Sequence, residues 1–196
     1  ANGATIGGAV SVTAGNTDTG AGGDATLNFD GTTTSTSTLT IKGGTTGTDL
    51  ALVTVSGDAT FTAITLDEVG AAEQNAALTI DSTTANQTIT GTIDGETAND
   101  GALNIVNSRK VATFASNIGA SKAIGLVTVG NAGADGNAVF SGSVSAANIV
   151  VDATSGGATT NSTADFNGNV TGAIALKADA ANDGQANVNF AANVTG

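Results

Sequence analysis

Six amino acids are missing from this 196-residue chain: cysteine, methionine, proline, tryptophan, tyrosine and histidine. Without thiols and imidazoles the chain cannot build a zinc site of cysteine and histidine ligands, and no serine or threonine can be activated by a histidine base. No apolar run approaches the roughly 20 residues of a membrane-spanning helix. These absences exclude most enzyme chemistry, so we predict no catalytic residue and no enzymatic activity.

Positive charge is also scarce. Five lysines and arginines face seventeen aspartates and glutamates, which gives a net charge of -12 at pH 7 and a pI near 4.1. Such a chain is repelled by nucleic acids and by anionic membranes. We therefore expect neither a nucleic-acid partner nor membrane insertion, and interpret the charge as one that keeps an extracellular surface soluble and attracts cations.

What the chain does contain is a repeated pattern. A large apolar residue recurs at a spacing that settles near 25 along the numbering, in most copies with a small residue two positions later: Phe29, Phe61, Ile89, Phe114, Phe140, Phe166 and Phe190. A second set keeps the same period: Val55, Ile80, Ile105, Val129, Val151 and Leu176. Both sets lie in alternating apolar and polar stretches, which are typical of strands with one buried face.

A period near 25 with short strands and glycine-rich turns predicts an all-β fold, a parallel β-solenoid. Each repeat would form one lap, or rung, and roughly seven rungs about 4.8 Å apart would make a rod about 34 Å long. We expect the phenylalanine set to stack inside the core as one column. The alternative is a β-sandwich, which has similar turns but needs no recurrence of this period.

The recurrence divides the chain unevenly. We predict one solenoid domain over residues 1–196, with irregular first rungs in residues 1–50 and regular repeats in residues 51–196. The reason is that Ile41 precedes Val55 by much less than one full period. The segment Leu39 to Ile41 is then either a third face or part of a rung with a deletion.

One local motif suggests a metal. The segment Gly130-Asn131-Ala132-Gly133-Ala134-Asp135 resembles one nonapeptide of the calcium-binding RTX repeats, in which backbone carbonyls and an aspartate surround the ion. The run from Gly20 to Asp24 is a poorer copy. The candidate ligands are therefore Asp24, Asn131 and Asp135, although no tandem copy follows either motif. Calcium is the only cofactor that the sequence suggests.

Acidic residues concentrate between Asp67 and Asp100, and solenoid enzymes that cleave polysaccharides use carboxylates in a groove. The only nearby cations are Arg109 and Lys110, and no tryptophan or tyrosine is available to stack on a sugar. We interpret this cluster as solvated turn residues.

The phrases Ala138-Val139-Phe140-Ser141-Gly142-Ser143-Val144 and Ala164-Asp165-Phe166-Asn167-Gly168-Asn169-Val170-Thr171 resemble the passenger regions of large bacterial surface antigens. The most similar in character are proteins of the rickettsial outer-membrane protein B type and related autotransporter and surface-layer proteins. The resemblance extends over residues 50–196. It implies an extracellular solenoid on a bacterial cell surface, with adhesion as an activity, and transfers no functional residue because the shared positions are core positions.

The two ends add an expectation about assembly. The chain begins at Ala1 without an initiator methionine, and no cap-like segment follows Phe190 and Val194. An open rung exposes unpaired strand edges, so either the chain is cut from a longer array or copies stack end to end or side by side. Our first hypothesis is a self-associating structural protein, such as a surface layer, a filament or an adhesin stalk. The second is an extracellular module that binds calcium or a glycan, with a host or cell-surface glycan or protein as partner.

Overall fold

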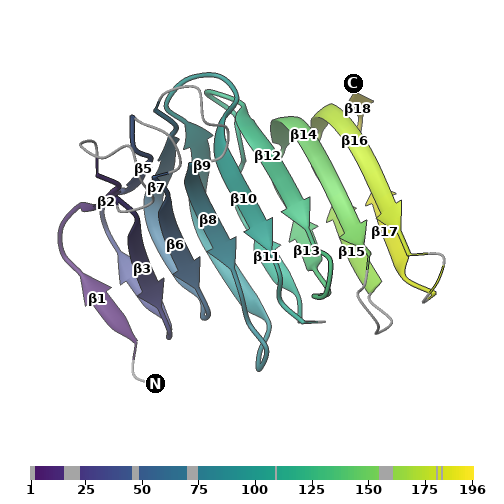
Figure 1. Ribbon diagram of the computed structural model, residues 1–196, viewed down its shortest axis with the longest axis horizontal. Coiled ribbons are helices and arrows are strands. Elements are labelled where there is room, and N and C mark those ends of the chain that lie inside the picture. Colours follow the sequence, from purple (N-terminus) through teal and green to yellow (C-terminus); the bar gives the residue numbers. More distant parts are fainter. Residues whose placement is uncertain are drawn as a thin grey trace.

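The computed structural model describes residues 3–15, 23–45, 49–69, 75–108, 110–154, 161–179, 181 and 183–196. In these ranges the chain forms strands and no helix. The strands follow one another along the long axis of the molecule, from the N-terminal rung at one end to the C-terminal rung at the other (Figure 1). The all-β class predicted from the sequence is thus confirmed.

One sheet contains all the strands of the predicted phenylalanine set except that of Phe29. Its parallel strands lie in the order β1 (Ala4–Ile6), β4 (Thr33–Ser35), β7 (Ala59–Asp67), β9 (Gln87–Gly95), β11 (Ala112–Phe114), β13 (Asn137–Phe140), β15 (Asn161–Phe166) and β17 (Gln185–Phe190). Each strand hydrogen-bonds to the strand one lap earlier and one lap later, so sequence neighbours are not sheet neighbours.

The second sheet lies on the other side of the core. Its strands are β3 (Ala25–Phe29), β6 (Ala51–Val55), β8 (Ala76–Ile80), β10 (Asp100–Ile105), β12 (Ile124–Val129), β14 (Val144–Ala153), β16 (Val170–Ala178) and β18 (Val194–Thr195). These pairings are also parallel. Antiparallel pairing, which a Greek-key sandwich requires, occurs in the described residues only as one isolated bridge between Asn131 and Ala134.

A short third face joins the two sheets. Here β2 (Val10–Thr13) pairs with β5 (Leu39–Lys42), and Leu39 pairs with Ile64 in the second half of β7. The column continues through paired residues of later rungs: Ile93, Ile118, Val144, Val170 and Val194. The segment Leu39 to Ile41 therefore belongs to a third face and not to a shortened rung.

The register of the strands matches the period of the sequence. Phe114, Phe140 and Phe166 are direct partners in one sheet. In the other sheet, Val55 pairs with Ile80, which pairs with Ile105. Each partner is the next member of its predicted set, so the structure is a parallel β-solenoid of about seven turns, as predicted. The side chains that point inward from the three faces form one continuous apolar core.

The corners between faces need glycine. Between β7 and β9, Phe61 and Thr62 both lie opposite Gly91, which has a φ of +118°. Between β14 and β16, Ala146 and Ala147 both lie opposite Gly172, with a φ of +140°. A bulge of this kind bends the strand, and glycine adopts the required backbone conformation without steric cost.

The connection into the second sheet shortens along the rod. Strand β2 ends at Thr13 and β3 begins at Ala25, and β7 ends at Asp67 and β8 begins at Ala76. In the later rungs β14 and β16 each run around this corner as one strand. Glu68 and Asn99, which belong to connections of earlier rungs, line the hollow described below together with residues of β12 and β14.

Candidate functional site

Four phenylalanines form a continuous stack in the core. The ring centroids of Phe114 and Phe140 are 5.0 Å apart, those of Phe140 and Phe166 4.8 Å, and those of Phe166 and Phe190 5.5 Å, with interplanar angles of 9° to 15°. Ile89 precedes them as the direct partner of Phe114. The rings of Phe114, Phe140 and Phe166 are buried and pack the interior, whereas Phe190 at the end of the stack is exposed.

Two members of the predicted column lie elsewhere. Phe29 pairs with Val55, so it belongs to the second sheet. Phe61 lies in the bulge of β7, and it is Ala59 that pairs with Ile89. The rings of Phe29 and Phe61 still meet across the core, 5.9 Å apart and tilted by 56°. The phenylalanine column thus begins at Phe114, and the two wider intervals at the start of the predicted set come from this change of position.

The predicted calcium ligands form backbone hydrogen bonds. Asp24 Oδ1 accepts a hydrogen bond from Leu50 N at 2.8 Å, and Asp135 Oδ1 accepts one from Asn161 N at 2.6 Å, each joining two neighbouring rungs. Asn131 Oδ1 accepts one from Ala134 N at 3.0 Å within its own turn. No group of three or more acidic side chains positioned to hold a metal occurs among the described residues. Gly20, Ala21 and Gly22 of the poorer motif lie outside the described residues.

The described acidic residues between 67 and 100 lie at the ends of strands and in the adjoining turns. Asp67 pairs with Lys42, and Asp94 Oδ1 accepts a hydrogen bond from Ser121 N at 2.9 Å. Asp100 accepts hydrogen bonds from the backbone N–H and the hydroxyl of Thr97. Glu73 and Arg109 lie outside the described residues. These contacts tie the carboxylates to neighbouring backbone and side-chain groups.

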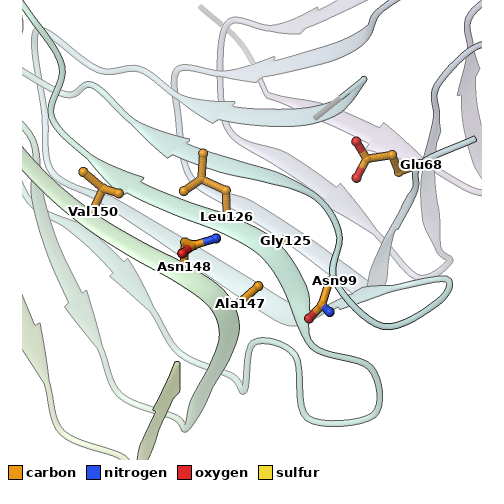
Figure 2. Close-up of a pocket in the computed structure, with 7 residues that line it drawn as sticks. All are labelled: Glu68, Asn99, Gly125, Leu126, Ala147, Asn148 and Val150. Carbon is orange, nitrogen blue, oxygen red and sulfur yellow. The ribbon is translucent and has the colours of Figure 1, made fainter. Parts of the chain in front are cut away.

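A hollow of about 410 Å³ lies on the outer surface of the solenoid, where connections of earlier rungs meet β12 and β14. It is lined by Glu68, Asn99, Gly125, Leu126, Ala147, Asn148 and Val150 (Figure 2). Figure 2 shows Leu126, Asn148 and Val150 together on neighbouring strands, with Glu68 on the opposite side of the hollow. Glu68 Oε2 accepts a hydrogen bond from Gly101 N at 3.0 Å, while its buried Oε1 has no hydrogen-bond partner among the described residues.

The lining combines polar and apolar groups. Leu126 and Val150 are half-buried although they point outward, and the amides of Asn99 and Asn148 are exposed. Our reading of the sequence missed this site, apart from including Glu68 among the acidic turn residues. One feature of the sequence could have indicated it. Leu126 and Val150 are apolar residues at outward positions of strands whose inward positions are also apolar.

The C-terminal rung, formed by β16, β17 and β18, exposes its core positions. Phe190 is 42% exposed, Val194 45% and Leu176 53%, whereas the equivalent residues one rung earlier, Phe166, Val170 and Val151, are at most 1% exposed. These three are the large apolar residues that the described chain exposes. They form an apolar edge beside unpaired strand groups.

The comparisons with known proteins add no identification. No protein family, no curated protein and no solved structure matches the chain. Within the described residues, no helix is long and apolar enough to span a membrane.

Proposed function

We propose that this protein is a structural component of a bacterial cell surface, a scaffold that self-associates into a layer, a fibre or an adhesin stalk. The observation that carries the proposal is the exposed apolar edge of the C-terminal rung, formed by Leu176, Phe190 and Val194. The resemblance of residues 50–196 to bacterial passenger and surface-layer regions supports the extracellular location.

The first and last rungs are complementary in position. Strand β17 continues the column that begins with β1, β18 continues the column that begins with β2, and β16 continues the column that begins with β3. If a second copy stacks in the same direction, Leu176 lies against Phe29 of that copy and Val194 lies against Val10. A head-to-tail contact of this kind leaves a free edge at each end, so it generates open filaments instead of closed dimers.

Sedimentation velocity over a series of concentrations tests the association. We expect the wild-type chain to form species whose size increases with concentration, and electron microscopy to show rods. Leu176→Asp should shift the distribution to monomer, because a carboxylate would be buried against Phe29 of the next copy. The matched control is Ala175→Asp, because Ala175 is the neighbouring residue on the same strand and its side chain points outward. A wild-type chain that is strictly monomeric at all concentrations would contradict the proposal.

A second candidate function is glycan binding in the hollow around Asn148. Amides and a carboxylate hydrogen-bond hydroxyl groups, and Leu126 and Val150 provide an apolar floor for the C–H faces of a sugar ring. A glycan array with the wild-type chain and Asn148→Ala tests this candidate. Binding that the variant loses supports it, and an empty array contradicts it.

A further inference from the structure

Asp49 carries a buried carboxylate that has no hydrogen-bond partner in the described ranges of the chain. The residue is 0% exposed, and neither Oδ1 nor Oδ2 has a hydrogen-bond partner within the described part of the chain. The ion pairs formed by described residues, Lys42 with Asp67 and Lys177 with Asp152, do not include it. An ionised carboxylate buried in this way is costly unless another group compensates its charge.

Glycines from two neighbouring rungs surround this carboxylate. A Cβ atom on Gly23 would lie 2.6 Å from Asp49 Cγ, and 2.9 and 2.7 Å from its Oδ1 and Oδ2. A Cβ atom on Gly44 would lie 2.6 Å from Asp49 Cβ and 2.6 Å from the carbonyl oxygen of Gly15. Glycine at these two positions leaves the room that the Asp49 side chain occupies, and the carbonyl oxygen of Gly15 lies on the same side of Gly44 as that side chain.

The next rung contributes a second unpartnered oxygen. Asn75 is 3% exposed, and its Nδ2 donates hydrogen bonds to Gly44 O at 2.8 Å and Val69 O at 2.9 Å. Its Oδ1 has no hydrogen-bond partner among the described residues and lies against Gly43. Two buried polar side chains on successive rungs, Asp49 and Asn75, thus flank the dipeptide Gly43-Gly44 with unpaired oxygens.

We propose that Asp49 is the anionic ligand of a calcium ion bound at this corner of the solenoid. Carboxylate, amide and backbone carbonyl oxygens are the ligands that calcium takes in proteins, and zinc is excluded as the preferred metal because the chain has no histidine or cysteine. The site differs from the predicted candidates Asp24, Asn131 and Asp135. It goes beyond the proposed scaffold function and does not depend on whether copies associate.

The test measures thermal unfolding and isothermal titration with calcium chloride after treatment with a chelator. We expect one binding site in the wild-type chain and a rise in Tm of about 5–10 °C at a calcium concentration about 100-fold above Kd. Asp49→Asn is nearly isosteric and removes the buried charge. Without calcium it should unfold at a temperature equal to or above that of the wild type, and calcium should not shift its Tm.

Asp135→Asn is the matched control, because Asp135 is a buried aspartate in a glycine-rich turn several rungs away. It should keep the full calcium response. A wild-type chain whose Tm and titration are unaffected by calcium would show that the carboxyl group is neutralised in another way and would overturn the proposal. The proposal would also be overturned if Asp49→Asn kept the response and Asp135→Asn lost it.

Discussion

At the scale of single residues, the position of a phenylalanine in the stack decides how far its ring is buried. Phe140 has rings on both sides at 5.0 and 4.8 Å and is 1% exposed, while Phe190 has one neighbouring ring and is 42% exposed. The energetic value of the same side chain should therefore depend on its rung.

We predict that Phe140→Ala lowers the free energy of unfolding by about 3–5 kcal/mol, the usual cost of removing a buried aromatic ring and leaving a cavity. Phe190→Ala should cost less than half of this, because much of its ring is already in water. Urea denaturation of both variants measures the difference. Equal losses for the two would show that the stack is not the packing element described here.

Asp152 links stability to pH. Burial works to raise the pKa of its carboxyl group, but hydrogen bonds from the hydroxyl and backbone N–H of Thr154, together with Lys177, hold the pKa below the ordinary value of 3.8. Because the folded-state pKa is depressed, this stabilisation is present above pH 3.8 and is lost as the pH falls through the lower folded-state value.

We therefore expect Asp152→Asn to be less stable than the wild type by about 1 kcal/mol at pH 7, and the difference to shrink as the pH falls well below 4. Urea denaturation at pH 7 and in a pH series below 4 measures both values. A difference that stays the same across this range would mean that the charge of Asp152 does not contribute.

The sequence predicted residue positions well where spacing is regular. The equal intervals between Phe114, Phe140 and Phe166 placed these rings in one column, because a constant lap length keeps residues in register. It failed for Phe29 and Phe61, since a phenylalanine satisfies the inward pattern on either sheet and in a bulge. It also gave no indication that Asp49 is buried, because burial at a corner depends on which turn lies over it.

At the scale of elements, the corners are set by backbone conformation. A Cβ atom on Gly91 would overlap the carbonyl oxygen of Phe61, and one on Gly172 would overlap the carbonyl oxygen of Ala146. The carbonyl belongs in each case to the bulged residues of the preceding rung. The corner glycine is therefore required both by its positive φ and by the proximity of that rung.

We predict that Gly91→Ala destabilises the protein by about 2–4 kcal/mol, since both backbone strain and a steric clash oppose the methyl group. Gly133→Ala should cost only about 1–2 kcal/mol, because Gly133 has a φ of +135° but no heavy atom within 4 Å of the added Cβ. Gly8→Ala, with open space and no positive φ, should stay within about 0.5 kcal/mol.

Chemical denaturation of the three variants separates the two causes. The order of destabilisation should be Gly91, then Gly133, then Gly8. Comparable losses for Gly91→Ala and Gly133→Ala would indicate that the neighbouring rung does not constrain the corner.

The elements were only partly predictable from sequence. Period-two alternation located the strands of both sheets. The third face was visible in the segment Leu39 to Ile41, which the sequence left open between a third face and a rung with a deletion. The candidate site was not predictable as a unit. The hollow combines Glu68 and Asn99, from connections of two earlier rungs, with residues of β12 and β14, and residue spacing does not reveal that these side chains meet.

At the scale of the whole molecule, the fold explains the composition. Stacked parallel rungs bury small and medium apolar residues in columns, so a chain without tryptophan, tyrosine or methionine still forms a continuous core. Two of the acidic side chains that lie in strands, Asp67 and Asp152, pair with lysines. The proposed association by the C-terminal rung would extend the stacking of parallel rungs between molecules.

In a parallel solenoid, distance along the rod increases with rung number. Because the chain has no cysteine, pairs of spin labels can be introduced at outward positions of one column in the second sheet, from Asn28 through Thr54, Thr79, Asn104, Thr128 and Val150 to Ala175. Double electron–electron resonance should give backbone separations of about 19 Å for Asn28→Cys with Thr128→Cys and about 29 Å for Asn28→Cys with Ala175→Cys, since each rung adds about 4.8 Å. Distances that do not increase with rung number would contradict the solenoid.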